Sequence, residues 1–145
     1  MQVERASAND VPAVEALLAE ADLPLAGAAE AVAGLGVVAR GEAGTVIGAA
    51  AVERFGASGL LRSVVVAPDL RGAGIGRALV DAAEAQAREA GIGELFLITE
   101  TAEAWFPRLG YERVMREAAL PAVGASVEFT MACSVSGVVM RRTLA

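Results

Sequence analysis

The sequence predicts one α/β domain that spans residues 1–145. Two observations support this prediction. Short apolar segments typical of β-strands alternate with amphipathic helical segments along the chain. In the segment 64–77, an apolar strand leads through a short turn and a loop of spaced glycines into a helix. A length of 145 residues is enough for one domain with a hydrophobic core that needs no disulfide or structural metal.

The N-terminal elements follow from alternation and from capping signals. Residues 2–6 alternate in polarity and predict an opening strand. Ser7 and Asp10 have the spacing of a capping box, and the helix after them has apolar residues every three or four positions until residues 22–24 end it. A second helix is expected over residues 26–33, where two glycines stop it.

Three strands and a long helix form the centre of the chain. Strands are expected over residues 37–40 and 45–52, joined by a glycine-containing hairpin turn, and a third strand over residues 60–66 completes an antiparallel meander. The helix 75–90 has an apolar stripe on one side and a charged stripe on the other, and Gly91 provides its C-terminal cap.

The C-terminal third alternates between the two kinds of element. Its expected elements are a strand over residues 94–98, a helix over 101–109, a strand over 111–115, a short helix over 121–129 and a final strand over 136–143.

The glycine loop before the long helix has the features of a pyrophosphate cradle. Gly72, Gly74 and Gly76 let the backbone approach a ligand without obstruction by Cβ atoms. The helix after them directs unpaired N–H groups and a positive dipole end toward an anion. Arg71 and Arg77 bracket the loop. The alternative is a strand-to-helix turn whose glycines serve only tight packing.

The spacing distinguishes among phosphate-binding loops. A dinucleotide-binding loop has its third glycine three residues after the second, but Arg77 holds that position. A nucleotide P-loop needs a lysine followed by Ser or Thr, whereas this loop has Arg77-Ala78. The segment 66–76 instead resembles the acetyl-CoA loop of the GNAT superfamily of N-acetyltransferases, in which a strand ending in Val-x-Pro precedes Arg-Gly-x-Gly-x-Gly.

This resemblance extends over nearly the whole chain, because the order of the expected elements is that of GNAT proteins. Residues 104–111 are similar to the family's helix that ends in an aromatic pair before Leu-Gly-aromatic. The resemblance implies an acyl-CoA N-acyltransferase fold, with a mixed, mostly antiparallel sheet of about six to seven strands flanked by helices. The C-terminal stretch, with residues 126–129, Cys133 and residues 138–140, resembles the GNAT proteins encoded in arsenic-resistance operons.

Composition excludes several classes of chemistry. The chain has no histidine, so catalysis that needs an imidazole is excluded, and its single cysteine, Cys133, cannot build a thiolate metal site. We therefore expect no metal. The alternatives for Cys133 are a covalent acetyl intermediate or an arsenic ligand, but without a histidine to activate it and without a second thiol we regard it as an ordinary thiol. A net charge of −6 argues against a nucleic-acid partner. No apolar segment approaches the roughly 18 residues of a membrane span, and the N-terminus lacks a secretory pattern, so we expect a cytoplasmic protein with no membrane partner.

The resemblance implies an acetyl-CoA site built largely from backbone groups. The strand before the loop would hold the pantetheine and the acetyl oxygen, and the loop would hold the pyrophosphate. Family members often protonate the thiolate with a tyrosine at the position of Phe106, but the one tyrosine of this chain is Tyr111. Thr99 replaces an asparagine that contacts pantetheine in many relatives. The expected cofactor-binding residues are Val64, Val65, Val66, Arg71, Gly72, Ala73, Gly74, Ile75, Gly76, Arg77, Thr99 and Phe106.

Acetyl transfer requires an uncharged amine, a stabilised oxyanion and a protonated leaving thiolate. The candidates for an acidic catalytic or substrate-binding residue are Glu53, at the end of an apolar strand, and Glu103, which would share a helical face with Phe106. Glu100 is a further candidate. Each glutamate is also explained as an ordinary charge at a strand end or a helix N-terminus.

Arg62 is the third catalytic candidate. It interrupts an apolar strand two residues before Val64, so strict alternation predicts that both side chains face the same side. There Arg62 would bind a substrate carboxylate or oxyanion through two N–H groups, or it would pair with Glu53 across the neighbouring strand.

Together these features predict an N-acetyltransferase that moves the acetyl group of acetyl-CoA to a primary amine of a small amino-acid-like molecule. The narrower resemblance adds arsenic or xenobiotic resistance. The alternatives are a non-catalytic acyl-CoA-binding sensor or interaction module, favoured by the missing tyrosine, and an acetyltransferase of protein N-termini or lysines. Since family members often dimerise through C-terminal strands, the strand 136–143 is expected to contribute to a homodimer.

Overall fold

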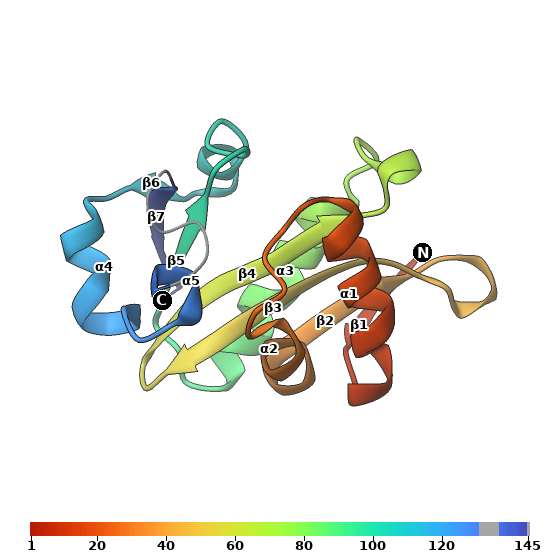
Figure 1. Cartoon of the computed structure of the whole chain (residues 1–145), viewed down its shortest axis with the longest axis horizontal. Coiled ribbons are helices and arrows are strands. Elements are labelled where there is room, and N and C mark those ends of the chain that lie inside the picture. Colours follow the sequence, from red (N-terminus) through yellow and green to blue (C-terminus); the bar gives the residue numbers. More distant parts are fainter. Residues whose placement is uncertain (131–136, 145) are drawn as a thin grey trace.

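The chain folds around one seven-stranded sheet with helices on both faces (Figure 1). This computed structural model describes residues 1–130 and 137–144. The strands lie in the order β1-β2-β3-β4-β5-β7-β6, and every neighbouring pair is antiparallel except β4 and β5, which are parallel. The expected mixed, mostly antiparallel α/β fold is therefore confirmed. The strands are β1 (Gln2–Arg5), β2 (Gly36–Arg40), β3 (Val46–Phe55), β4 (Ser58–Val66), β5 (Glu94–Thr99), β6 (Glu112–Arg113) and β7 (Val138–Thr143).

Helices of different lengths cover the two faces of the sheet. Buried residues of α3 pack with β2, β3, β4 and β5 in one apolar cluster. On the other face, α1 and α2 pack against β2 and β3, and α4 and α5 pack against β4, β5 and β7. The helices are α1 (Val11–Glu20), α2 (Ala28–Leu35), α3 (Ile75–Glu89), α4 (Arg116–Val123) and α5 (Val127–Thr130), and short 3-10 helices cover Ala8–Asp10, Glu42–Gly44, Pro68–Leu70 and Phe106–Leu109.

The central elements agree with the sequence analysis. β2, β3 and β4 form the predicted antiparallel meander. The predicted apolar stripe of α3 is buried, and Gly91 follows the helix with a φ of +87°. The Asp10 carboxylate accepts the Ser7 backbone N–H at 2.9 Å, as the capping signal predicts.

A β-bulge in β4 changes the predicted direction of one side chain. Ala49 pairs with Val65 and Ala51 pairs with Arg62, so one residue of β3 lies opposite two residues of β4. Ser63, inside the bulge, has a φ of +58°. As a result Val64 packs in the α3 cluster, whereas Arg62 lies beside Ala51 on the opposite face. The expectation that Arg62 and Val64 face the same side is wrong because the bulge interrupts the alternation.

The predicted helix over residues 101–109 is also wrong. After an irregular segment, only Phe106–Leu109 is helical, and it is a 3-10 helix. The Thr99 hydroxyl accepts the Ala102 N–H at 2.9 Å and holds the chain in a turn. Pro107 has no N–H to donate, which further disfavours an α-helix here. Glu103 and Phe106 therefore share no helical face, since Glu103 is exposed and Phe106 is buried.

Two further boundaries differ from the prediction. The strand expected over residues 111–115 is reduced to β6, because only Glu112 and Arg113 pair with β7. The helix expected over residues 121–129 is two helices, α4 and α5, with Gly124 between them. Of the predicted last strand, Ser136 lies outside the described residues, as does Cys133. Among the described helices, none has the length and apolar character needed to span a membrane.

A buried polar network connects α3 to the C-terminal strands. The Tyr111 hydroxyl donates to the Glu84 carboxylate at 2.8 Å, and Arg142 Nη1 donates to the same carboxylate at 2.9 Å. Arg142 Nη1 also donates to the Leu109 carbonyl at 2.8 Å. Glu84, which the helical pattern places on the charged stripe, is therefore buried and paired. The network fixes the end of the Phe106–Leu109 segment against α3.

We expect the substitution Tyr111→Phe to lower the free energy of unfolding by about 1–3 kcal/mol, because the buried Glu84 carboxylate loses one donor. Urea denaturation measures this change. In a Glu84→Gln background the same substitution should cost less, because the acceptor is no longer charged. An equal cost in both backgrounds would contradict the assigned hydrogen bond.

Candidate active site

The site begins where β4 and β5 separate. The two strands pair only at Ser58 with Glu94, Gly59 with Leu95 and Leu60 with Phe96. Beyond these pairs β4 continues to Val66, while β5 pairs with β7 through its other edge. The separation leaves backbone groups of β4 that face β5 available to a ligand, as the GNAT resemblance requires.

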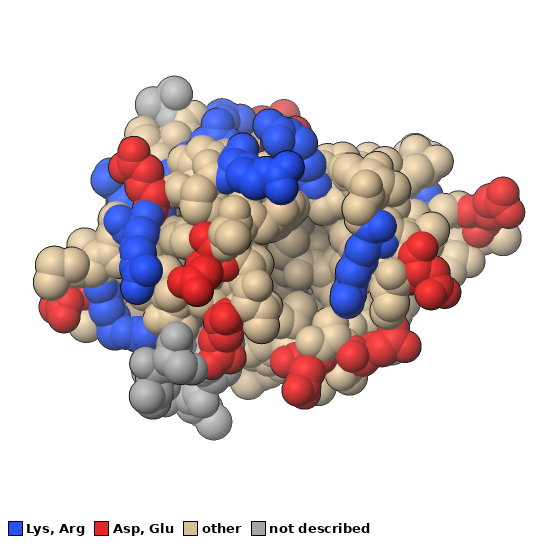
Figure 2. Space-filling view, turned by 90° about the horizontal axis from the view of Figure 1, so that it is seen from above, with Lys and Arg blue, Asp and Glu red and all other residues tan. Residues whose placement is uncertain are grey.

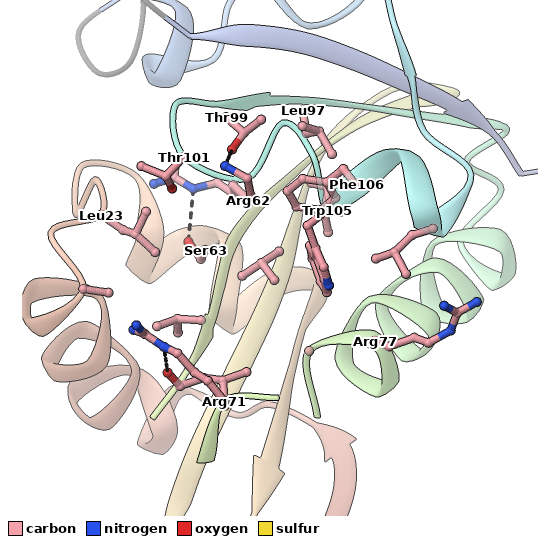
Figure 3. Close-up of a pocket in the computed structure, with 18 of the residues that line it drawn as sticks. Leu23, Arg62, Ser63, Arg71, Arg77, Leu97, Thr99, Thr101, Trp105 and Phe106 are labelled. Carbon is pink, nitrogen blue, oxygen red and sulfur yellow. Dashed lines mark hydrogen bonds between the residues drawn. The ribbon is translucent and has the colours of Figure 1, made fainter. Parts of the chain in front are cut away.

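A cleft of about 990 Å³ occupies this separation (Figure 3). Its walls come from β4, the loop after it, the start of α3, the end of β5, the Phe106–Leu109 segment and the loop between α1 and α2. All but one of the expected cofactor-binding residues line it: Val64, Val65, Val66, Arg71, Gly72, Gly74, Ile75, Gly76, Arg77, Thr99 and Phe106. The exception, Ala73, is an exposed residue of the same loop.

The start of α3 has the geometry of an anion-binding helix terminus. Gly74 is its N-cap in a left-handed conformation, and Ala78 donates to the Gly74 carbonyl at 3.1 Å as the helical hydrogen bonds begin. The N–H groups of residues 75–77 come before this first helical hydrogen bond, so they have no acceptor within the helix and point out of its N-terminal end. Arg71 folds back so that its Nε donates to the Val66 carbonyl at 3.3 Å. This end of the cleft can hold a phosphate group.

The three loop glycines are required for different reasons. Gly72 and Gly74 have φ values of +85° and +82°, and a Cβ atom on either would meet open space. Their requirement is therefore conformational. Gly76 lies under Trp105, and a Cβ atom there would come within 3.2 Å of the indole. Trp105 in turn packs edge-on against Phe106 with a ring-centroid distance of 4.8 Å.

Tyr111 does not lie in the cleft. Its ring packs in the core at 5.7 Å from the ring of Phe106, and its hydroxyl points to Glu84. Burial and the Glu84 carboxylate raise the pKa of Tyr111 well above its ordinary value. A tyrosine that remains protonated and buried away from the cleft is poorly suited to protonate a departing thiolate. The hydroxyl groups of the cleft belong instead to Ser63, Thr99 and Thr101.

Arg62 is the centre of a buried polar cluster at another part of the cleft. Its side chain has no exposed surface, and Nη1 lies 2.9 Å from the Glu53 carboxylate. Nη2 donates to the Ala26 carbonyl at 2.7 Å, and Nε donates to the Ser63 hydroxyl at 3.3 Å. The predicted pairing with Glu53 is therefore present. A guanidinium held by so many protein groups has little capacity for two hydrogen bonds to a substrate carboxylate.

Glu128 belongs to the same cluster, and sequence reasoning did not identify it as a candidate. It is 5% exposed, lines the cleft, and lies 3.5 Å from Arg62 Nε. Burial and the charge of Glu53 raise the pKa of Glu128 above its ordinary value, against the opposing effect of Arg62. The sequence analysis includes residues 126–129 only in the narrower family resemblance, and their contact with Arg62 could not be predicted because α5 reaches β4 only in the tertiary structure.

The two predicted acidic candidates occupy different positions. Glu53 lies behind Arg62 and accepts the Ser126 hydroxyl at 2.7 Å, but it does not line the cleft. Glu103 is exposed and also does not line the cleft. The structure therefore brings Glu53 and Arg62 together and leaves Glu103 apart from them. Glu100 lines the cleft near Thr99.

Basic side chains gather on part of the rim of a hollow in the surface (Figure 2). The arginines that line the cleft are Arg62, Arg71, Arg77 and Arg108, and the acidic residues are Asp22, Glu100 and Glu128. Arginine N–H groups suit the phosphates of a polyanionic ligand. Among the described residues, no group of three or more acidic, histidine or cysteine side chains has the arrangement of a metal site.

A sheet that opens between β4 and β5, with a glycine loop and a helix N-terminus at the opening, defines the acyl-CoA N-acyltransferase class of folds. Comparison with known proteins identifies the family. A family model described as an acetyltransferase (GNAT) domain matches residues 33–113. The chain belongs to this family.

Two relatives match part of the chain in sequence. An uncharacterized N-acetyltransferase, CT2212, of Chlorobaculum tepidum is 40% identical over 57 residues, which are 39% of this chain and 36% of that protein. An amino-acid acetyltransferase of Ralstonia nicotianae is 36% identical over 70 residues, or 47% of this chain and 16% of that protein. The chain thus spans little more than a third of one of these relatives and less of the other.

A solved structure is similar over the full length of both chains. Rv2747 from Mycobacterium tuberculosis, in complex with CoA and NLQ, has a TM-score of 0.76 and 25% identity, and the match covers 100% of each chain. The fold in which that protein holds CoA is therefore the fold of this chain.

We expect Gly74→Ala to lower the affinity for acetyl-CoA about tenfold. An alanine Cβ has space at this position, but the left-handed conformation costs about 1–2 kcal/mol, so the loop relaxes away from its binding shape. Isothermal titration calorimetry measures the affinity. Gly34→Ala is the matched control, because Gly34 lies in α2 with open space around it and no positive φ. Equal affinities for the two variants would contradict the assigned role of the loop.

Proposed function

We propose that this protein is an acetyl-CoA-dependent N-acetyltransferase that acts on a primary amine of a small amino-acid-like molecule. The observation that carries the proposal is the cleft between β4 and β5, whose walls include the glycine loop and the N-terminus of α3. In this proposal the loop and Arg71 hold the pyrophosphate of acetyl-CoA. The open edge of β4 receives the pantetheine and the acetyl oxygen.

The proposed acceptor class is supported by the relatives. One relative is an amino-acid acetyltransferase, although the match covers only 16% of its length. The acidic residues of the cleft, Asp22, Glu100 and Glu128, suit an acceptor with an ammonium group. The narrower resemblance of the C-terminal stretch favours amino-acid-like arsenicals, whose acetylation would neutralise the ammonium group. An arsenic-resistance role is therefore the finer form of the proposal.

The proposed catalytic machinery has three parts. Backbone groups of residues 64–66 stabilise the oxyanion, as the family resemblance implies. Because position 106 is a phenylalanine, no tyrosine is there to protonate the thiolate. A water molecule or the ammonium group of the acceptor donates the proton instead. Glu53 and Arg62 form an ion pair at the acceptor end of the cleft, and the cluster around this pair binds the acceptor. A role for Glu103 stays a prediction, since Glu103 is exposed and outside the lining of the cleft.

An acyl-CoA-binding sensor without catalytic activity is the second candidate. The absence of a tyrosine at position 106 favours it. A homodimer that uses β7 and a cytoplasmic location are further proposals that follow from the family resemblance.

Thiol release from acetyl-CoA, measured against a panel of acceptors, tests the proposed function. The panel contains amino acids, amino-acid-like phosphonates and arsenicals, and matched analogues in which a hydroxyl replaces the amine. Binding of acetyl-CoA is measured in parallel. We expect saturable turnover with one class of amine and none with its hydroxyl analogue.

Two other results would have different meanings. Tight binding of acetyl-CoA without turnover of any acceptor would favour the sensor. No binding of acetyl-CoA would contradict the assignment of the glycine loop and with it the proposed function.

A further inference from the structure

The cleft extends from the glycine loop to a second end around Arg62. Arg62 precedes Val66, the last residue of β4, by four residues, so it lies further along the strand from the glycine loop. Leu23 and Arg62 lie in this part of the pocket in Figure 3, and Asp22, Pro24 and Glu128 also contribute to its walls. If the loop holds the pyrophosphate, this part of the cleft is available to the acceptor.

Two carboxylates share one guanidinium at this end. Arg62 Nη1 lies 2.9 Å from Glu53, and Arg62 Nε lies 3.5 Å from Glu128. With both glutamates ionised, the cluster has a net charge of −1, and the side chains of Arg62 and Glu128 are buried while that of Glu53 is 20% exposed. Such a cluster favours the approach of a cation, because a buried uncompensated charge is costly.

The two carboxylates differ in their exposure to the cleft. Glu53 receives the Arg62 guanidinium and the Ser126 hydroxyl on the same oxygen, at 2.9 and 2.7 Å, and does not line the cleft. Glu128 has the longer contact with Arg62 and lines the cleft. Of the two, Glu128 is therefore the residue that contributes to the wall of the cleft.

We propose that Glu128 is a catalytic residue that binds the ammonium group of the acceptor and accepts its proton. This inference rests on the proposed function and names the group that recognises the substrate. The amine nitrogen, freed of that proton, forms a bond to the acetyl carbon, and the C–S bond breaks with its electron pair on sulfur. The second proton lost by the nitrogen ends on the thiolate, so the products are an amide, the CoA thiol and one released proton.

The surroundings of Glu128 suit this role. Its charged form is disfavoured by burial and by Glu53 on β3, and it is favoured by Arg62 on β4. Asp22 and Glu100 line the same cleft from the α1–α2 loop and from the segment after β5. A carboxylate with a raised pKa is a stronger base than an exposed one and is better matched to an amine.

The test compares the wild-type chain of 145 residues with Glu128→Gln, Glu128→Asp and Glu53→Gln, using the best amine of the acceptor panel. The matched control is Glu117→Gln, an exposed glutamate of α4 outside the cleft. The kcat/KM for the amine is measured from pH 5 to pH 9 at saturating acetyl-CoA. The affinity for acetyl-CoA reports folding of each variant independently of the reaction.

We expect Glu128→Gln to lower kcat/KM roughly 100-fold or more near neutral pH, in the range of general base catalysis, with the affinity for acetyl-CoA unchanged. The acidic limb of the pH profile, which is the fall in kcat/KM as Glu128 becomes protonated, should disappear. The remaining kcat/KM should then change with pH only as the fraction of uncharged amine in solution changes. Glu128→Asp should keep the limb at a reduced rate. Glu53→Gln should move the limb to lower pH, because the charge of Glu53 raises the pKa of its neighbour.

Three results would overturn the proposal. In the first, Glu128→Gln retains the wild-type kcat/KM and pH profile. In the second, its kcat/KM falls by the same factor at every pH and the acidic limb stays intact. The limb could instead disappear in Glu53→Gln and persist in Glu128→Gln, which would make Glu53 the base. The proposed function is tested separately, because wild-type turnover and acetyl-CoA binding do not depend on these variants.

Discussion

The separation of β4 from β5 is the constraint on which the rest of the site depends. Parallel pairing at three residue pairs places the two strands side by side, and beyond these pairs β5 remains paired only with β7, along its other edge. The bulge at Ser63 lies in the part of β4 that pairs with β3 but not with β5, and bulges increase the local twist of a strand. An edge with unpaired backbone groups is normally a liability in a sheet. Here the same unpaired groups are the proposed contacts for a ligand that is itself rich in amides.

Arg62 connects parts of the fold that the sheet alone does not join. On one face, α1 and α2 cover β2 and β3, whereas α4 and α5 cover β4, β5 and β7. The Arg62 guanidinium lies between them, and a Cβ atom on Gly27 would come within 2.9 Å of both Arg62 and Val127. Buried ion pairs add little to stability when compared with apolar packing. The main effect of the cluster is therefore to fix the positions of the α1–α2 loop and of α5.

Local signals in the sequence predicted the cofactor end of the cleft but not the acceptor end. The glycine loop and α3 are encoded within one continuous segment, and its expected residues line the cleft except Ala73. The bulge at Ser63 has no such signal, because a serine with positive φ replaces the glycine that would have marked it. The contact between Glu128 and Arg62 joins α5 to β4 through tertiary packing. The helix expected over residues 101–109 failed because the Thr99 hydroxyl and Pro107 favour turns over an α-helix.

The distribution of charge in the cleft carries information that the net charge does not. The whole chain has a net charge of −6, which by itself argues against a polyanionic ligand. The cleft nevertheless contains four arginines and three acidic residues, a local balance of 4 − 3 = +1. Arg62 is already paired with two glutamates, so the positive charge available to a ligand comes from Arg71, Arg77 and Arg108. A cleft that is basic at the helix N-terminus and acidic around Glu128 suits an anionic donor at one end and a cationic acceptor at the other.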